Sequence, residues 1–209
     1  MKPKLIAFDL DGTLVNSAPD LADAVNTVLT HLGLPNRDEK SVCGWIGNGA
    51  PMLVKRAMAG EMNPPADPAR FDEAVEFFMR YYGEHMAKRG GLFPGVLEGV
   101  RELKQLGYRL AVVTNKHSRF TVPLLEELGV AEYMDHIGCG DQFKKLKPDP
   151  APLLETAERF AVKPEHVLMI GDSVNDVQAA RAAGCGILVV SYGYRDCERA
   201  EDLHADGVI

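Results

Sequence analysis

Two aspartates separated by a single residue, Asp9 and Asp11, follow a short apolar run near the start of the chain. The run, residues 5–8, predicts a buried strand, and residues two apart in a strand point to the same side. Both carboxylates are therefore expected to face one site where the chain turns at Gly12. Like charges held this close need a proton or a cation between them. A Mg²⁺ ion that binds carboxylate oxygens and keeps most of its waters for a phosphate ligand fits this arrangement.

Further polar groups follow later apolar runs and suit the same chemistry. Thr114 and Asn115 offer a hydroxyl, an amide and backbone N–H groups that can hold phosphate oxygens. The ammonium of Lys147 would offset the charge of phosphate and carboxylates together. Asp172 and Asp176 add two carboxylates between a strand end and a helix start. Four expected strand ends thus carry groups suited to one site for a metal ion and a phosphate.

Apolar spacing divides the chain into a helical part and a part in which strands and helices alternate. Between residues 18 and 86 apolar residues recur at helical spacing, which predicts a compact helical bundle. From residue 93 onward, short β-rich runs alternate with helical stretches, which predicts parallel strands joined by crossover helices. The predicted strands cover residues 110–113, 137–139, 167–170 and 187–190, and the predicted helices cover residues 96–106, 120–128, 152–160 and 177–183.

The first strand needs a sheet, and the later segment holds the only one available, so the helical part is expected to be an insertion. The predicted fold is α/β, with a Rossmann-like three-layer core built on a parallel sheet and an inserted all-helical cap domain. The core would comprise residues 1–15 and 94–209, and the cap residues 16–93 with two hinge linkers. Ligands of such sheets bind beyond the carboxyl ends of the strands, where the polar groups above would meet.

The composition is that of a globular protein and excludes several classes of partner. Hydrophobic residues make up 46% of the 209 residues and charged residues 25%, values that do not indicate disorder. A net charge of −7 argues against nucleic acid and against an anionic membrane, since both attract basic surfaces. The four cysteines show no C-x-x-C pair and no zinc-ligand spacing, which favours reduced thiols. We expect a cytoplasmic protein with no signal segment and no membrane span, acting as a monomer or a homodimer.

Taken together, the motifs resemble the haloacid dehalogenase superfamily. They occur in the order that the superfamily shows: Asp9-Leu10-Asp11-Gly12-Thr13, Thr114-Asn115, Lys147, and Gly171-Asp172 with Asn175-Asp176. The resemblance covers essentially the whole chain, because the insertion lies where that superfamily carries its helical cap. Within it, residues 11–21, 45–50, 113–116 and 191–194 resemble the phosphoglycolate phosphatases.

The resemblance implies a Mg²⁺-dependent phosphatase acting on a small phosphorylated metabolite, with 2-phosphoglycolate as the leading substrate. Asp9 would be the nucleophile and form an aspartyl phosphate, which divides one difficult step into two. Asp11 would act as general acid and base. The metal would be held by Asp9, the backbone carbonyl of Asp11 and Asp172, while Asp176 would act through a bound water or orient the catalytic Lys147. The implied substrate-binding residues are Gly12, Thr114, Asn115, Lys116, Asn48 and Gly49.

Each motif alone has a simpler explanation. A lone D-x-D-G is usually a turn. A calcium loop of the EF-hand kind is excluded, since it would need Gly at its sixth position and Glu at its twelfth, where Leu14 and Asp20 stand. Thr114-Asn115 and Gly171-Asp172-Ser173 are also ordinary helix caps. The shared order of all four motifs favours the catalytic interpretation.

Other functions could use the same motifs. A sugar phosphomutase would share the core, but such relatives place an arginine in the cap loop, where residues 47–50 here are Gly-Asn-Gly-Ala. A pyrophosphatase or another small-metabolite phosphatase stays open. A non-catalytic phosphate-binding protein would have no need of a nucleophile and a paired acid.

The predicted cap gives weaker signals. Residues 47–49 form either a mobile loop that presents backbone groups to the substrate or a turn between helices. Lys55 and Arg56 could meet a substrate carboxylate, although exposed surface charge is the simpler explanation. The aromatic residues between positions 77 and 82 are expected to be bundle core.

Overall fold

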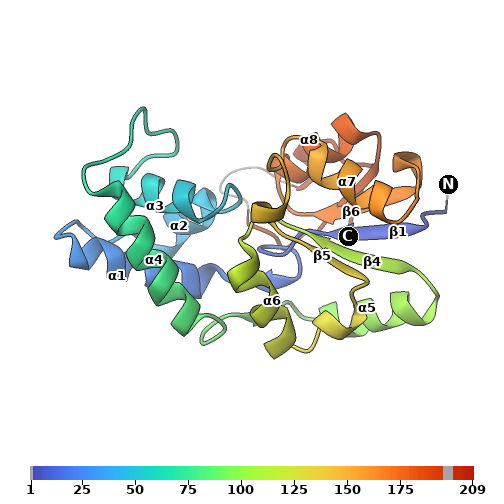
Figure 1. Cartoon of the computed structure of the whole chain (residues 1–209), viewed down its shortest axis with the longest axis horizontal. Coiled ribbons are helices and arrows are strands. Elements are labelled where there is room, and N and C mark those ends of the chain that lie inside the picture. Colours follow the sequence, from blue (N-terminus) through green and yellow to red (C-terminus); the bar gives the residue numbers. More distant parts are fainter. Residues whose placement is uncertain (1, 195–199) are drawn as a thin grey trace.

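A single parallel sheet forms the centre of the computed structural model, which describes residues 2–194 and 200–209. Its strand order is β5-β4-β1-β6-β7-β8 (Figure 1). In this order the strands are β5 (His136–Gly138), β4 (Arg109–Val113), β1 (Leu5–Phe8), β6 (Val167–Gly171), β7 (Gly186–Val189) and β8 (Gly207–Val208). The end of β1, Phe8, pairs with Val112 of β4 and Ile170 of β6. The polar residues that follow these three strands therefore emerge at the same edge of the sheet.

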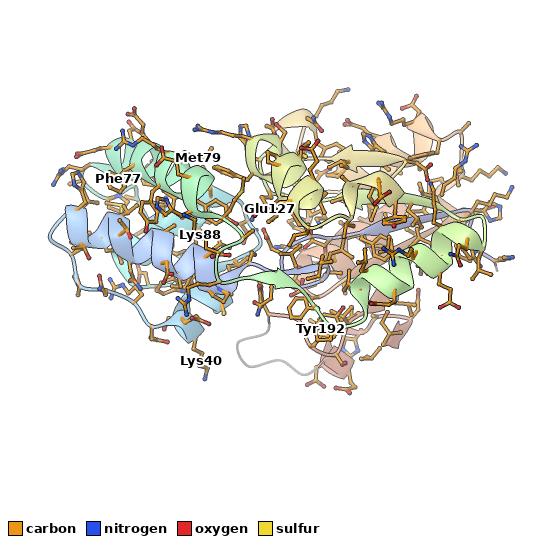
Figure 2. All side chains as sticks on the ribbon, turned by 90° about the horizontal axis from the view of Figure 1, so that it is seen from below. Lys40, Phe77, Met79, Lys88, Glu127 and Tyr192 are labelled. Atoms are coloured by element: carbon orange, nitrogen blue, oxygen red, sulfur yellow. The ribbon has the colours of Figure 1, made fainter. Side chains whose placement is uncertain are left out.

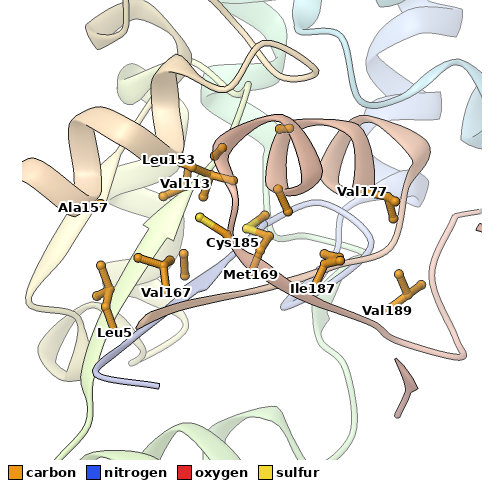
Figure 3. Packing of buried hydrophobic residues seen from close by; sticks show 14 of the residues in the cluster. Leu5, Val113, Leu153, Ala157, Val167, Met169, Val177, Cys185, Ile187 and Val189 are labelled. Carbon is orange, nitrogen blue, oxygen red and sulfur yellow. The ribbon is translucent and has the colours of Figure 1, made fainter. Parts of the chain in front are cut away.

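Helices cover both faces of the sheet and complete three layers (Figure 1). One face carries α5 (Val96–Gln105) and α6 (Ser118–Glu127), and the other carries α7 (Ala151–Arg159) and α8 (Val174–Ala183). Figure 3 shows the hydrophobic core between the sheet and helices α7 and α8, in which Leu5, Met169 and Ile187 of the sheet meet Leu153 and Val177 of the helices. Short 3-10 turns lie at Ala131–Tyr133, Gly140–Gln142, Pro164–His166 and Ala200–Leu203. The predicted α/β fold with a parallel sheet is confirmed.

Four further helices form a separate group beside the sheet, here called the helical segment (Figure 1). They are α1 (Ala18–His31), α2 (Glu39–Trp45), α3 (Ala50–Ala59) and α4 (Phe71–His85). Val25, Leu53 and Phe78 belong to the buried cluster that these helices share, and Phe120 of α6 joins it from the sheet side. The helix α2 lies within the predicted bundle, but its bounds could not be predicted. It buries only Val42 and Trp45, too few residues to show a periodic pattern.

The two chain segments that connect the helical segment to the sheet pair with each other. β2 (Val15–Asn16) and β3 (Gly91–Leu92) form a short antiparallel ribbon. Beside it, the Asp20 carboxylate accepts hydrogen bonds from the backbone N–H groups of Arg89 and Gly90 at 2.8 and 3.0 Å. The division into a core and a cap at positions 15/16 and 93/94 stays a prediction; the first boundary falls within β2 and the second lies just after β3.

Most predicted elements agree with the structure to within one or two residues, but α8 starts at Val174 rather than at residue 177. Ser173 and Asp176 make a reciprocal capping box that starts the helix earlier than its apolar pattern indicates. Among the residues that the structure describes, no helix combines the length and the apolar character needed to cross a membrane.

Candidate active site

Lys147 joins two of the predicted aspartates at the centre of the site. Its ammonium lies 2.9 Å from Oδ1 of Asp9 and 2.7 Å from Oδ1 of Asp176, and it donates to the carbonyl oxygen of Val113 at 2.7 Å. The side chains of Lys147 and Asp176 are 2% and 0% exposed, so water screens this ion-pair network weakly. The local sequence explains why Asp176 is available: its Oδ2 caps α8 by accepting from Ser173, while Oδ1 faces Lys147.

Asp172 completes a buried cluster of three carboxylates. Single carboxylate oxygens of Asp9, Asp172 and Asp176 all lie within 4.8 Å of one another. The backbone N–H of Tyr194 donates to Oδ2 of Asp172 at 2.7 Å, which orients that carboxylate. Because Lys147 neutralises only one of these three negative charges, the cluster fits a divalent cation held by oxygen ligands.

The electrostatics of the cluster also favour a bound cation. Burial raises the pKa of Asp9 to about 6, against the opposing effect of Lys147. Burial, together with the negative charges of Asp176 and Asp9, also raises the pKa of Asp172 well above its ordinary value. Burial alone would lower the pKa of Lys147, but Asp176 and Asp9 outweigh it, so this pKa is raised and the ammonium stays charged. Burial is the main cause of both raised carboxyl pKa values, and a bound cation would favour the ionised carboxylates again.

Asp11 lies outside this cluster and has a lysine of its own. The Nζ atom of Lys116 is 2.8 and 3.1 Å from the two carboxylate oxygens of Asp11, and Ser17 donates its hydroxyl to Oδ1. Lys116 also donates to the phenolic oxygen of Tyr82 at 2.9 Å. Tyr82 belongs to α4, so this chain of contacts connects the helical segment to the first strand end. The two predicted catalytic aspartates thus have different surroundings.

Thr114 and Asn115 lie at the end of β4 beside these groups, as predicted. Thr114 accepts the backbone N–H of Lys116 at 3.2 Å, which leaves its own hydroxyl hydrogen for a ligand. The Asn115 side chain is used differently: its Nδ2 donates to the carbonyls of Gly47 and Lys147, both at 2.8 Å, and its Oδ1 accepts from the backbone N–H of Lys147. In this structure its amide therefore ties two loops together, and the phosphate contact predicted for it would have to come from its backbone.

Three other predicted binding residues have local partners or line the cavity, and their contacts with substrate stay predictions. The backbone N–H of Gly12 donates to the carbonyl of Val15 at 2.9 Å. Asn48 uses its Oδ1 to accept from Arg56 at 3.0 Å. Gly49 lines the cavity described next.

Neighbouring residues of the predicted cap make contacts of different kinds. Arg56 is buried, not an exposed surface charge, and it donates to the carbonyls of Trp45 and Met62 and to Oδ1 of Asn48, so it supports the 47–49 loop. Lys55 forms an ion pair with Asp67. Phe78 and Tyr82 are bundle core, as expected, but they also line the cavity.

A small cavity of about 40 Å³ lies between the helical segment and the sheet edge. Its polar lining includes Asp9, Asp11, Thr114 and Lys116. Its apolar lining comes largely from the helical segment and comprises Leu21, Ile46, Leu53 and Phe78 with Phe120 of α6. One water needs about 10 to 15 Å³ of cavity volume, so the cavity has room for only a few waters.

Comparison with known proteins identifies the family. The sequence model of the haloacid dehalogenase-like hydrolases matches residues 6–190, most of the chain. The chain belongs to this family. This hydrolase is 45% identical over 206 residues to a phosphoglycolate phosphatase of Thiobacillus denitrificans, an alignment that covers 99% of the chain and 91% of the relative.

Solved structures of similar proteins agree with this assignment. A predicted phosphoglycolate phosphatase from Haemophilus somnus is 37% identical, with a TM-score of 0.92, and the match covers 100% of this hydrolase and 94% of that chain. CbbY from Rhodobacter sphaeroides, solved in complex with phosphate, is 26% identical, with a TM-score of 0.80 over 99% of this hydrolase and 93% of that chain.

Three residues of the hydrolase contribute to the site without having been predicted to. Ser17 and Tyr82 hold Asp11 and Lys116, and Tyr194 reaches Asp172 through its backbone. Ser17 could have been predicted, because its hydroxyl follows Asp9 and Asp11 closely in the sequence. Tyr82 had the pattern of a core residue, and only the packing of α4 on the sheet edge reveals its hydroxyl contact.

Proposed function

We propose that this protein is a Mg²⁺-dependent phosphatase that hydrolyses 2-phosphoglycolate to glycolate and phosphate in the cytoplasm. The observation that carries the proposal is the pair of separate surroundings at the end of β1: Asp9 contacts Lys147 inside a carboxylate cluster, while Asp11 contacts Lys116 in the cavity. The relatives from Thiobacillus denitrificans and Haemophilus somnus, whose names give phosphoglycolate as the substrate, support the choice of ester.

Asp9 is the nucleophile in this mechanism. Lys147 holds Oδ1 of Asp9 at 2.9 Å, which leaves Oδ2 to attack phosphorus. The new bond joins Oδ2 to phosphorus, and the bond between phosphorus and the glycolate oxygen breaks. Charge spreads over the phosphoryl oxygens in the transition state, where the Lys147 ammonium and the Thr114 hydroxyl stabilise it.

Asp11 moves the proton in both steps. It gives its proton to the departing glycolate oxygen, and in the second step it takes a proton from the water that attacks the aspartyl phosphate. That attack breaks the bond between Asp9 and phosphorus and releases phosphate. Ser17 and Lys116 keep the Asp11 carboxylate in place for both transfers.

Asp9 and Asp172 are the side chains that would hold Mg²⁺, together with the backbone carbonyl of Asp11, while Asp176 orients Lys147 from the outer side. When bound, Mg²⁺ would supply positive charge that reduces the repulsion between the phosphate and the carboxylates.

Lys116 supports a substrate with a second negative group. It is 7% exposed and lines a cavity whose other walls are mainly apolar, so an anionic group entering there would meet a buried ammonium. The carboxylate of phosphoglycolate, which one methylene group separates from the phosphate ester oxygen, suits this position better than an uncharged group does.

The test is phosphate release from a panel of esters in the presence of Mg²⁺. The panel contains 2-phosphoglycolate, its neutral counterpart ethyl phosphate, a nucleotide, pyrophosphate and hexose phosphates. We expect the highest kcat/KM for 2-phosphoglycolate and a large loss for ethyl phosphate. If the folded protein releases phosphate from none of these compounds, the proposed phosphatase activity is wrong. Transfer of the phosphoryl group between hexose positions would favour a phosphomutase instead.

A further inference from the structure

The loop after β7, residues 191–194, lies between the carboxylate cluster and the two linkers of the helical segment. The first linker is residues 16–19 and the second is residues 88–94. Figure 2 shows Tyr192 near the middle of the molecule, between the helical segment on the left and the sheet on the right. The sequence Ser-Tyr-Gly-Tyr carries no group that the proposed mechanism uses. Its contacts nevertheless reach both the site and the ribbon of β2 and β3.

On the side of the site, the main chain of the loop packs directly against Asp172. The backbone N–H of Tyr194 donates to Oδ2 of Asp172 at 2.7 Å. A Cβ atom at Gly193 would collide with the Cβ of Asp172, so only glycine lets the loop approach this closely. The loop therefore limits the orientations that the Asp172 carboxylate can adopt.

On the side of the linkers, the Tyr194 side chain holds the first linker at two points. Its hydroxyl donates to Oδ1 of Asn16 and accepts the backbone N–H of Ala18, both at 2.8 Å. Both linker contacts fall at the boundary between β2 and α1, where the helical segment begins.

The second linker contacts the same loop. The ring of Phe93 lies 4.5 Å from the ring of Tyr192 and 6.3 Å from that of Tyr194, measured between centroids. Tyr192 also donates its hydroxyl to the carbonyl of Thr13 at 2.9 Å. Both linkers are thus connected to the loop that orients Asp172.

We propose that Tyr194 is a positioning residue that couples the carboxylate cluster to the linker of the helical segment. Its backbone orients Asp172, and its hydroxyl fixes that backbone relative to Asn16 and Ala18. Movement of the first linker therefore changes how well Asp172 is held for a cation. The inference rests on the proposed function only in taking Asp172 as a metal ligand.

The experiment measures Mg²⁺ binding to the metal-free, full-length protein by calorimetry. Tyr194→Phe keeps the ring and the backbone N–H but removes the hydroxyl. We expect its Kd for Mg²⁺ to rise about 10-fold, the low end of the effects of changes outside the ligands of a metal site, because the N–H that bonds Asp172 remains but is held less firmly. Tyr133→Phe is the matched control, because it removes a hydroxyl that accepts from Arg101 away from the site, and its Kd should not change.

Asn16→Ala tests the linker side of the coupling. It should weaken Mg²⁺ binding in the same way, and the double variant should lose no more than either single variant, since both remove one connection. Additive losses would show that the two residues act independently and would overturn the inference. The unfolding temperature in EDTA serves as a second measurement, because a merely structural role would lower it without changing the Kd.

The result separates this inference from the proposed function. If Tyr194→Phe binds Mg²⁺ like the wild type, the inference is wrong even where 2-phosphoglycolate is hydrolysed. If Mg²⁺ binding weakens as expected but no ester is hydrolysed by the wild type, the positioning role stands and the proposed phosphatase does not. Should the wild type bind no Mg²⁺, Asp172 is not a metal ligand and the inference ends.

Discussion

At the scale of single residues, Asp9 and Asp11 differ in what surrounds them rather than in what they are. Both follow the same strand, yet Asp9 contacts Lys147 in a cluster of buried carboxylates and Asp11 contacts Lys116 in the cavity. A nucleophile must be ionised, whereas a general acid must carry a proton. The proposed mechanism gives these two roles to Asp9 and Asp11, and because burial raises the pKa of Asp9, its ionisation there would depend on a bound cation.

The nucleophile is tested by Asp9→Asn, which keeps the shape of the side chain but removes its ability to attack phosphorus. Turnover should fall by at least about 10⁴-fold, because the covalent route is lost. Binding of 2-phosphoglycolate with Mg²⁺, followed by calorimetry, should persist. Asp67→Asn is the matched control, since it changes an exposed aspartate paired only with Lys55 among the contacts described here. Turnover near that of the control would rule out an aspartyl phosphate.

The raised pKa of Asp9 predicts how the metal-free protein responds to pH. Burial raises this pKa from 3.8 to about 6, so the folded state binds the proton more tightly than the unfolded state does. The resulting stability is present below about pH 4 and is lost as the pH rises through about 6. Relative to Asp9→Asn in EDTA, the wild-type free energy of unfolding should fall by something on the order of 3 kcal/mol between those limits.

Urea unfolding of both proteins at a series of pH values measures this difference. A difference that does not vary with pH would mean that Asp9 has an ordinary pKa in the folded protein. Added Mg²⁺ should reverse the loss at high pH, because a cation stabilises the ionised carboxylate.

At the scale of elements, the ribbon of β2 and β3 depends on one glycine. A Cβ atom at Gly90 would collide with the carbonyl oxygen of Asn16 and approach Oδ2 of Asp20 to 2.8 Å. Gly90→Ala should therefore destabilise the protein by about 1 to 3 kcal/mol through overpacking. Gly91→Ala is the matched control, because a Cβ there meets nothing within 4 Å, and its effect should stay within about 0.5 kcal/mol.

Equal unfolding midpoints in urea for these two variants would show that the ribbon adjusts freely. The same measurement on Asp20→Asn would tell whether the carboxylate that accepts from Arg89 and Gly90 contributes to the loss.

Elements were predictable from the sequence where their apolar pattern is long or their position in the sheet is central. The strands that end near Asp9, Thr114 and Asp172 are short, but apart from the exposed Arg109 their residues are buried or nearly so and carry a strong apolar signal. The pairing of β2 with β3 was not predictable, because two-residue strands have no periodicity and their contact joins residues more than seventy positions apart in sequence. The same holds for contacts of the site, such as those of Asn115 with Gly47, which depend on how α3 meets the sheet edge.

At the scale of the whole molecule, the helical segment closes over the site. Gly47 accepts hydrogen bonds from Asn115 at 2.8 Å and from Asn175 at 3.3 Å, and Tyr82 accepts one from Lys116. The cavity beneath holds about 40 Å³. We propose that the helical segment moves away from the sheet edge when substrate enters, with the linkers as the segments that bend.

Limited proteolysis tests this movement. The linkers, residues 16–19 and 88–94, should be cut in the free protein and become protected when Asp9→Asn is saturated with Mg²⁺ and 2-phosphoglycolate, because a ligand that contacts both sides favours the closed arrangement. The exposed loop at residues 61–70 is an internal control whose cleavage should not change. Mass spectrometry of the early fragments distinguishes the two regions. Equal cleavage of the linkers with and without ligand would mean that the helical segment does not close on the substrate, and the small cavity would then have to enlarge by rearrangement of its side chains alone.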